Sequence, residues 1–298
     1  MGEDKKLILA RTRGFCGVVR SVLATLEKLL AEHPASRICV LGELMHNRHV
    51  NDSFARRGVL FIDDPDELPE GAILLLGAHG VPPETERRAR TAALRVVDTT
   101  CPLVRERQRE AAALGADDTL ILLGYRDHAE TVGILGRSGA GANIVVSSAS
   151  EAERIRVPSR PVLLSQTTFD GFELERCREI LERRYPDLSF RCGICRASRE
   201  RQACVEKLAG EVEAVAVAGS PHSSNARRLC ETAERCGARA VLVESAAELP
   251  PELFRLRRVG LTAGASTPDA DVEAMRAAFS AAGFAVAEQP PDGRRSNL

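Results

Sequence analysis

Aromatic residues are scarce in this chain of 298 residues: they make up 4% of it, with no Trp and only two Tyr. Proteins that bind single-stranded nucleic acid stack the bases on aromatic side chains, so a platform of that kind is not expected here. An excess of positive charge is also missing, because 41 Lys and Arg stand against 42 Asp and Glu, a net charge of −1. The composition therefore predicts no nucleic-acid partner held mainly through phosphate contacts.

Long hydrophobic runs are absent as well. The longest apolar run, around 72–78, is far too short to cross a bilayer. Residues 1–6 contain no apolar segment of the kind that a secretory signal needs. We therefore expect a cytoplasmic protein with no membrane partner. Walker A, GxGxxG and GxSxG motifs are missing too, which argues against nucleotide binding and α/β-hydrolase chemistry.

Short apolar runs alternate with amphipathic stretches along nearly the whole sequence. Runs such as 73–76 and 121–123 are continuously apolar, which is typical of strands covered on both faces. This rhythm predicts an α/β architecture with mainly parallel sheets. The predicted strands are 6–10, 37–41, 59–62, 72–76, 94–97, 119–123, 144–147, 161–165, 214–218, 240–243 and 259–262. The predicted helices are 18–31, 52–57, 83–91, 103–114, 130–137, 173–184, 199–213, 225–236 and 269–282.

Length alone suggests about two domains, with one or three also possible. Cys16, Cys101 and Cys195 each stand between an extended segment and a helix, and the intervals between them are 101 − 16 = 85 and 195 − 101 = 94 residues. This spacing is compatible with three small α/β units of about 90 residues. A single doubly wound sheet remains the alternative.

Polar residues gather directly after the predicted strands, where open α/β sheets bind their ligands. His46, His79 and His128 occupy such places, and Glu130 follows His128 closely. Two further segments, 223–225 and 266–268, each open a helix and carry hydroxyl or amide side chains. Because a helix N-terminus presents free N–H groups and a positive dipole end, both segments are candidate anion sites.

Nine cysteines are the unusual feature of the composition. In a reducing compartment a disulfide framework is not expected, so the thiols are metal ligands, reactive groups or small buried residues. Cys192 and Cys195 form a lone CxxC, which a zinc, redox or iron–sulfur site could each use. The cysteines interpreted as packing residues are Cys39, Cys177, Cys204, Cys230 and Cys236.

Nine short motifs, in this order along the chain, resemble those of the 4-hydroxy-3-methylbut-2-enyl diphosphate reductase family. They are RGFC ending at Cys16, HNR at His46, AHG at His79, DTTCPLV around Cys101, HAETVG at His128, QTT around Thr167, IC ending at Cys195, SSN at Ser223 and TAGAS ending at Ser266. The resemblance runs from about Leu9 to Phe279, nearly the whole chain.

The resemblance implies a three-lobed, trefoil-like assembly of three small parallel-sheet α/β domains around a central iron–sulfur cluster. The expected lobes are 12–98, 99–193 and 194–282, the third completed by an N-terminal strand at 5–11, and 283–298 is expected to be a flexible tail. Cys16, Cys101 and Cys195 are the implied ligands of one [4Fe-4S] cluster per chain. Three thiolates leave one iron open, where the family binds the substrate hydroxyl.

The resemblance also implies the reaction and the residues that carry it. The allylic hydroxyl of the diphosphate would leave as water, giving isopentenyl and dimethylallyl diphosphate in the last step of the non-mevalonate pathway. Ferredoxin or flavodoxin would donate the electrons singly. The implied catalytic residues are Glu130, which relays protons, with Thr167 and His128. The implied substrate-binding residues are His46, His79, His128, Thr167, Ser223, Ser224, Asn225 and Ser266.

Some positions depart from the family pattern. The segment after Cys16 is short by one residue or lacks a second glycine, Ala129 stands where Pro is usual, and Cys195 is not followed by an aromatic and Thr. These departures leave a second hypothesis open, a divergent cluster-binding paralogue with another substrate or a sensor role. A zinc-dependent hydrolase of phosphorylated compounds is the third hypothesis.

Overall fold

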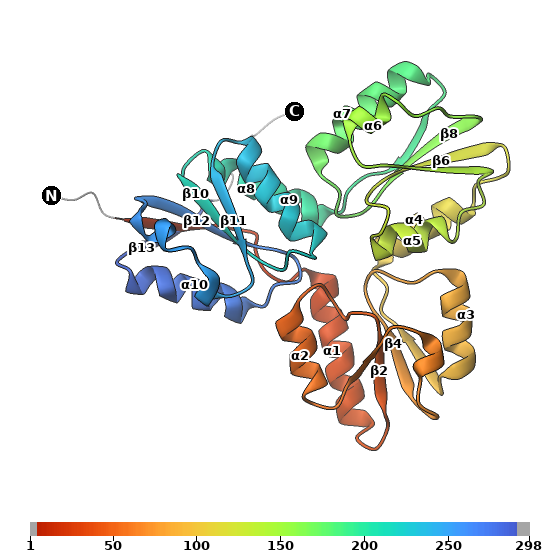
Figure 1. The fold of residues 1–298 in the computed structure, drawn as a ribbon, viewed down its shortest axis with the longest axis horizontal. Helices are drawn as coiled ribbons and strands as arrows, with labels where there is room; N and C mark the ends of the chain where they lie inside the picture. Colours follow the sequence, from red (N-terminus) through yellow and green to blue (C-terminus); the bar gives the residue numbers. More distant parts are fainter. Residues whose placement is uncertain (1–4, 291–298) are drawn as a thin grey trace. The chain divides into compact units, whose positions relative to one another are not determined.

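The computed structural model describes residues 5–290 and contains three separate sheets, each flanked by helices (Figure 1). Every strand pair in these sheets is parallel. The predicted α/β class with three parallel-sheet units is confirmed, and a single doubly wound sheet is excluded for the described residues. By its contacts the chain divides into unit 1, residues up to Cys16 together with those from Arg196 onward, and unit 2, Gly17–Cys195.

Unit 1 is built on sheet A, with the strand order β11-β10-β12-β1-β13. The N-terminal strand β1 lies between β12 and β13, so the two ends of the described chain are joined in one sheet, red beside blue in Figure 1. The strands are β1 (Lys6–Leu9), β10 (Ala214–Ala218), β11 (Arg239–Val243), β12 (Arg258–Ala263) and β13 (Ala285–Glu288). The helices are α8 (Arg196–Ala209), α9 (Ser224–Arg235) and α10 (Asp269–Ala281), with short 3-10 helices at Ala246–Glu248 and Pro251–Arg255.

Unit 2 contains two four-stranded sheets. Sheet B has the order β3-β2-β4-β5 and sheet C the order β7-β6-β8-β9. The elements of sheet B are α1 (Gly17–Glu32), β2 (Ile38–Leu41), α2 (Arg48–Ala55), β3 (Leu60–Ile62), a 3-10 helix at Pro65–Glu67, β4 (Ile73–Leu76), α3 (Pro83–Ala92) and β5 (Arg95–Asp98). Those of sheet C are α4 (Pro102–Ala112), β6 (Asp118–Leu123), α5 (Ala129–Leu135), β7 (Ala142–Val146), α6 (Ala149–Ala152), β8 (Arg160–Ser165), α7 (Gly171–Arg184) and β9 (Ser189–Cys192).

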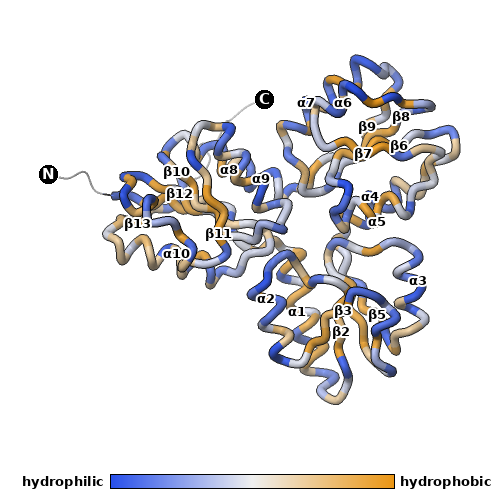
Figure 2. Tube along the Cα trace, in the orientation of Figure 1, coloured by the Kyte–Doolittle hydropathy of each residue, from blue (hydrophilic) through white to orange (hydrophobic). Residues whose placement is uncertain are grey.

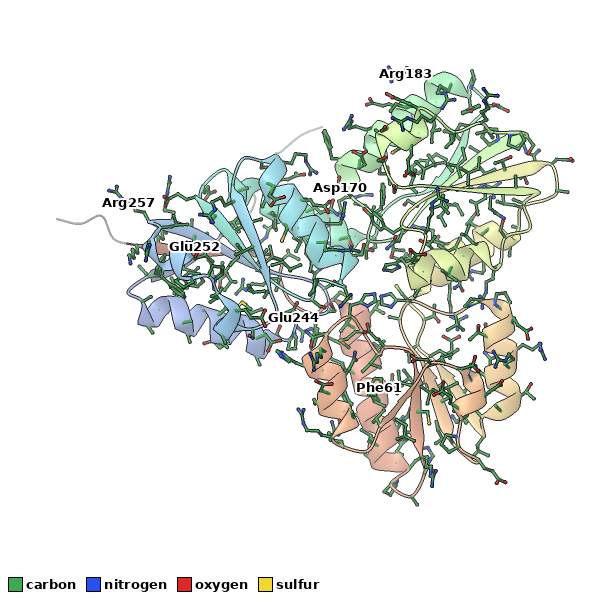
Figure 3. All side chains as sticks on the ribbon, viewed as in Figure 1. Phe61, Asp170, Arg183, Glu244, Glu252 and Arg257 are labelled. Atoms are coloured by element: carbon green, nitrogen blue, oxygen red, sulfur yellow. The ribbon has the colours of Figure 1, made fainter. Side chains whose placement is uncertain are left out.

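The core lies along the central strands, which Figure 2 shows as the hydrophobic parts of each sheet. All four residues of β4 and all six of β6 are buried, as expected for strands covered by helices on both faces. Helix caps fix where the covering helices begin. Asp170, labelled in Figure 3, caps α7 by accepting from the Glu173 N–H at 2.8 Å. Rigid strands and capped helices thus hold the loops at the carboxyl ends of the strands.

The structure differs from the predicted elements mainly at sheet edges and helix starts. Strands β9 and β13 and the four-residue helix α6 were not predicted, and β13 lies inside the range 283–298 predicted to be a flexible tail. Both strands are short edge strands, and β13 is largely exposed, so their sequences lack the buried apolar run of a central strand. Residues 291–298 of the predicted tail lie outside the described residues. Helix α2 starts at Arg48 rather than 52, because Asn47 caps it.

The predicted lobe boundaries at 98/99 and 193/194 stay predictions. Within the described residues, no helix combines the length and the apolar character that crossing a membrane requires.

Candidate functional site

The residues predicted for the site lie in loops that follow strands, or in the first turn of the next helix. In unit 2 the loops after β2, β4, β5, β6, β8 and β9 carry them, and in unit 1 those after β1, β10 and β12. Because parallel strands end at the same edge of a sheet, each unit collects its own group there. The unit 2 group is His46, His79, Cys101, His128, Glu130, Thr167 and Cys195, and the unit 1 group is Cys16, Ser223, Ser224, Asn225 and Ser266.

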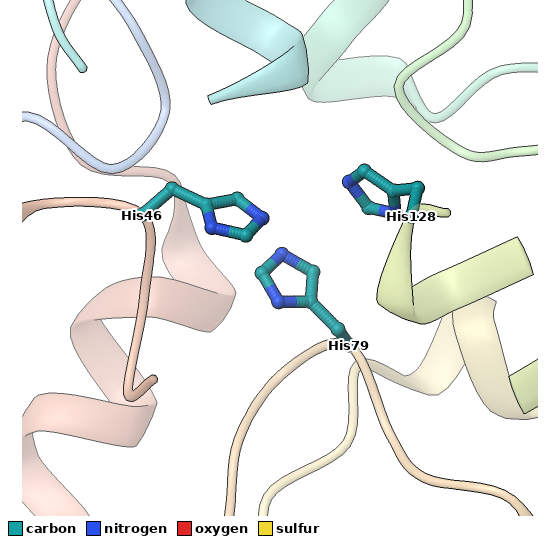
Figure 4. A group of neighbouring side chains, drawn as sticks. All are labelled: His46, His79 and His128. Carbon is teal, nitrogen blue, oxygen red and sulfur yellow. The ribbon is translucent and has the colours of Figure 1, made fainter. Parts of the chain in front are cut away.

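Three histidines from three different loops meet in unit 2 (Figure 4). The rings of His46 and His79 stack with centroids 4.4 Å apart, and His128 stands edge-on to both at 5.6 and 5.4 Å. Burial lowers the pKa of His79 well below 6.5, and the neighbouring rings of His46 and His128 lower it further. His79 is therefore neutral at pH 7 in the free protein. An anion placed among these rings would favour their protonated forms.

One carboxylate and one backbone amide orient His46 and His128. The Nδ1 atom of His46 lies 2.8 Å from Oε2 of Glu43, and since a carboxylate only accepts, this Nδ1 carries a proton. His128 is the N-cap of α5, where its Nδ1 accepts from the backbone N–H of Glu130 at 3.2 Å. The proton of a neutral His128 then resides on Nε2, which makes that atom a hydrogen-bond donor. A donor of this kind suits an anion better than a metal ion.

Glu130 is the most perturbed acid of the group. It is only 1% exposed, and burial raises the pKa of its carboxyl to about 7. Thr167 opposes this rise by donating twice, from its backbone N–H to Oε1 at 2.7 Å and from its hydroxyl to Oε2 at 2.9 Å. A carboxyl that titrates near neutrality can both give and take a proton at pH 7, which is what general acid–base chemistry requires.

Cys101 and Cys195 also lie near Glu130 and Thr167. Burial raises the pKa of the Cys101 thiol, the N–H groups of Leu103 and Val104 at the start of α4 lower it, and Glu130 and Cys195 raise it again. The amide of Cys195 donates to the Thr167 carbonyl at 2.8 Å. A chain of hydrogen bonds therefore runs from the Cys195 loop through Thr167 and Glu130 to His128.

The unit 1 group is tied together by Ala265. The amide of Ala265 donates to Oδ1 of Asn225 at 2.9 Å, and its carbonyl accepts from the amide of Cys16 at 3.1 Å. Ser223 caps α9, and its hydroxyl lies 3.5 Å from that of Ser266. The loops that follow β1, β10 and β12 thus converge. The hydroxyl and amide residues at the start of α9 are those expected at an anion site.

Comparison with known proteins identifies the family. The family model described as LytB protein matches residues 7–280 of this chain. The chain belongs to the LytB protein family. The resemblance drawn from the nine motifs is thereby confirmed.

Relatives of this LytB chain carry reductase names. A protein of Rhodococcus jostii (strain RHA1), named 4-hydroxy-3-methylbut-2-enyl diphosphate reductase, is 40% identical over 89% of this chain and 81% of its own length. A protein of Desulfotalea psychrophila (strain LSv54 / DSM 12343), with the same name, is 37% identical over 91% of this chain and 88% of its own length. The solved structure of the E-1-hydroxy-2-methyl-but-2-enyl-4-diphosphate reductase from Plasmodium falciparum matches with a TM-score of 0.89 and 25% identity, covering 98% of this chain and 94% of that one. The LytB chain is accordingly an enzyme of the oxidoreductase class.

Two residues near the LytB site were not predicted from the sequence. Glu43 orients His46, and its only signal is its place three residues earlier in the same loop. Arg107 is a buried guanidinium that also lowers the pKa of Glu130. The sequence of α4 does not distinguish Arg107 from the other charged residues of the helix, so the burial of its side chain could not be predicted.

The remaining cysteines mostly pack as predicted. Cys39, Cys177 and Cys204 are buried, while Cys230 is only partly buried. The prediction is wrong for Cys236, which ends α9 at its C-cap and is exposed. Each cysteine whose side chain the structure describes is a free thiol, in keeping with the expectation of no disulfide framework.

Proposed function

We propose that this chain reduces (E)-4-hydroxy-3-methylbut-2-enyl diphosphate to isopentenyl and dimethylallyl diphosphate, in the last step of the non-mevalonate isoprenoid pathway. Two electrons and two protons are consumed, and the allylic hydroxyl leaves as water. The names of the relatives support the substrate, since they cover most of this chain and most of their own lengths. The observation that carries the proposal is a buried acid, Glu130, whose pKa is raised to about 7, that interacts with the expected cluster ligand Cys101 and is bonded through Thr167 to the loop of Cys195.

The diphosphate is proposed to bind to both groups of polar residues. His46, His79 and His128 bring ring nitrogen atoms within 4.8 Å of one another, and ring N–H groups can donate hydrogen bonds to an anion. Ser223, Ser224, Asn225 and Ser266 supply hydroxyl and amide groups at a helix start. Because the chain's net charge is only −1, attraction for a diphosphate has to come from such local groups rather than from the whole protein.

Proton delivery is assigned to Glu130. Its carboxyl can hold a proton at pH 7 and release it to the departing hydroxyl, and its pKa suits return of the proton from water. Thr167 holds both carboxyl oxygens, which keeps the acid in one orientation. His128 joins the same hydrogen-bond chain through the Glu130 amide. Glu130 is therefore the proposed proton donor, Thr167 orients its carboxyl, and His128 is held beside it at the start of α5.

Cys16, Cys101 and Cys195 are proposed to hold one [4Fe-4S] cluster with a single open iron. The described residues fit such a group: Cys195 is near enough to Cys101 to act on its thiol, and the N–H groups of Leu103 and Val104 at the start of α4 oppose the rise in the pKa of Cys101 that burial causes. When bound, the cluster supplies electrons one at a time and an open metal site for the substrate oxygen. A one-electron carrier protein such as ferredoxin or flavodoxin is the proposed donor, and the cytoplasmic location stays a prediction.

A zinc-dependent hydrolase is the second candidate, because ligand atoms of His46, His79 and His128 lie within 4.8 Å of one another and could hold a metal ion. The tautomer of His128 argues against it, since its Nδ1 already accepts a hydrogen bond and its Nε2 carries the proton. The divergent-paralogue hypothesis rests on the sequence departures alone, which lie after Cys16, at Ala129 and after Cys195.

Anaerobic purification and reconstitution test these candidates together. The reductase proposal predicts a brown protein with about four iron and four sulfide per chain that reduces the allylic diphosphate with a one-electron donor. A protein that contains zinc and neither iron nor sulfide would support the hydrolase. A loaded cluster without turnover, in a chain that also fails to complement a strain lacking the reductase, would support the paralogue.

A further inference from the structure

Four residues of identical sequence recur at the same distance from two of the site cysteines. Arg-Glu-Arg-Gln occupies 105–108, beginning four residues after Cys101, and 199–202, beginning four residues after Cys195. The first copy lies on α4 and the second on α8. In both copies the last two residues are buried, with Arg107 and Arg201 only 4% and 3% exposed. The two copies therefore share both their sequence and the burial of their last two side chains.

Both buried arginines make the same contact. Nη2 of Arg107 donates to the carbonyl of Gly193 at 2.6 Å, and Nη2 of Arg201 donates to the carbonyl of Gly14 at 2.6 Å. Gly193 stands two residues before Cys195, and Gly14 stands two residues before Cys16. Each arginine thus lies six residues after one site cysteine and holds the loop that leads to another.

Packing alone does not require arginine at this position. Taking a guanidinium out of water is costly unless its hydrogen bonds are replaced. The corresponding position six residues after Cys16 is Val22, on α1, which is 2% exposed and simply apolar. Nη1 of each guanidinium bonds to its own helix, to Glu106 for Arg107 and to the Ala197 carbonyl for Arg201, so the contact that reaches another loop in both copies is the one from Nη2 to a glycine carbonyl.

The restrained loops are also held at the cysteine itself. The amide of Cys195 donates to the Thr167 carbonyl, and the amide of Cys16 donates to the Ala265 carbonyl. With the arginine contact two residues earlier, each cysteine backbone is fixed at two points. We propose that Arg107 and Arg201 are a matched pair of positioning residues, which fix the backbone of Cys195 and Cys16 so that both thiols are held ready for metal binding. The metal-binding part rests on the proposed function, whereas the loop restraint does not.

Hydrogen exchange in the metal-free protein tests the pair by a crossed pattern. Arg107→Met is expected to speed amide exchange in the segment 193–195 about 10- to 100-fold, as for loss of a charged hydrogen bond, and to leave 14–16 unchanged. Arg201→Met is expected to do the reverse. Arg109→Met is the matched control, because Arg109 is an exposed arginine on the same helix as Arg107. If Arg107→Met and Arg201→Met exchange at the same rates as Arg109→Met, the proposal is overturned. It is also overturned if either variant speeds exchange equally in both segments.

Milder variants keep the test decisive if a methionine variant does not fold. Arg107→Gln and Arg201→Gln bury no charge and shorten the side chain, and they are expected to give the same crossed pattern.

Failure of this inference can be told apart from failure of the proposed function. If the wild-type protein takes up no iron and sulfide, the proposed function fails, and the exchange pattern of the metal-free protein still decides the loop restraint. If the wild-type protein loads a cluster, Arg107→Met and Arg201→Met should release iron to a chelator faster than Arg109→Met does. Equal release rates in all three variants would reject the positioning role while the proposed function stands.

Discussion

The protonation of Glu130 is the sharpest prediction, because its size follows from the structure. Burial raises the pKa of this carboxyl from 4.5 to about 7 in the folded chain. At 1.36 kcal/mol per pKa unit, the difference corresponds to about 3 kcal/mol between the two protonation states. Since the folded-state pKa is raised, the protonated acid contributes full stability below pH 4.5, and that contribution is lost as the pH rises through 7.

Replacing Glu130 by Gln removes this titration while keeping the shape of the side chain. The free energy of unfolding of metal-free Glu130→Gln, minus that of the wild type, is expected to grow by about 3 kcal/mol between pH 4.5 and 8. Subtracting the wild-type value cancels the contributions of the groups that titrate in both proteins. Carbon-13 NMR of glutamate-labelled protein gives the midpoint directly, and the resonance missing from the variant assigns it. A stability difference that stays constant with pH, with a midpoint near 4.5, would refute the reasoning.

A companion variant separates the causes. Thr167→Val removes the hydroxyl donor to Oε2 and leaves the backbone N–H donor to Oε1. Because a hydrogen bond to the charged form stabilises it, its loss should raise the pKa of Glu130 further, by about one to two units. A midpoint that falls, or stays where it was, would mean that the hydroxyl does not act on the carboxylate.

Three further predictions concern metal, turnover and substrate binding. Cys101→Ser should lose the cluster, while Cys39→Ser, in the buried centre of a strand, should keep it. Iron and sulfide analysis after anaerobic reconstitution measures both, and a Cys101→Ser protein that keeps its iron and sulfide would show that the ligand assignment is wrong. Glu130→Gln should keep the visible spectrum of the cluster and lower kcat about 100-fold or more, so an active variant would reject the proton role. Gly80→Ala should weaken diphosphate binding about tenfold by displacing the His79 loop. Residue 80 has a φ of +71°, and a Cβ there would meet neighbouring side chains within 3 Å. An unchanged Kd in calorimetry would contradict this prediction.

The α/β class and the central strands could be predicted from the sequence because their signal is local. Strand β4 is a continuous apolar run, β6 contains one at 120–123, and Pro83 marks the start of α3 as expected. Edge strands carry no such signal, which is why β9 and β13 were not predicted. Helix α2 began earlier than expected because one side chain, Asn47, caps it.

The candidate site was predictable only in part, for a physical reason. The position of His79 after a strand follows from the sequence, but the burial that lowers its pKa and its stacking on His46 depend on loops that meet only in the folded unit. The same holds for Glu130, because the burial that raises the pKa of its carboxyl and the opposing hydrogen bonds from Thr167, 37 residues away, exist only in the folded unit. The burial of Arg107 cannot be read from a helix whose other charged residues face solvent.

The central claim is that this chain holds an iron–sulfur cluster whose open iron meets the allylic diphosphate. Mössbauer spectroscopy of the anaerobically reconstituted, iron-57-labelled protein tests it most directly, with and without that diphosphate. The account predicts about four irons per chain, one of them distinct from the other three and altered when the diphosphate is added. Four equivalent irons that do not respond to the diphosphate, or a protein without iron, would contradict it.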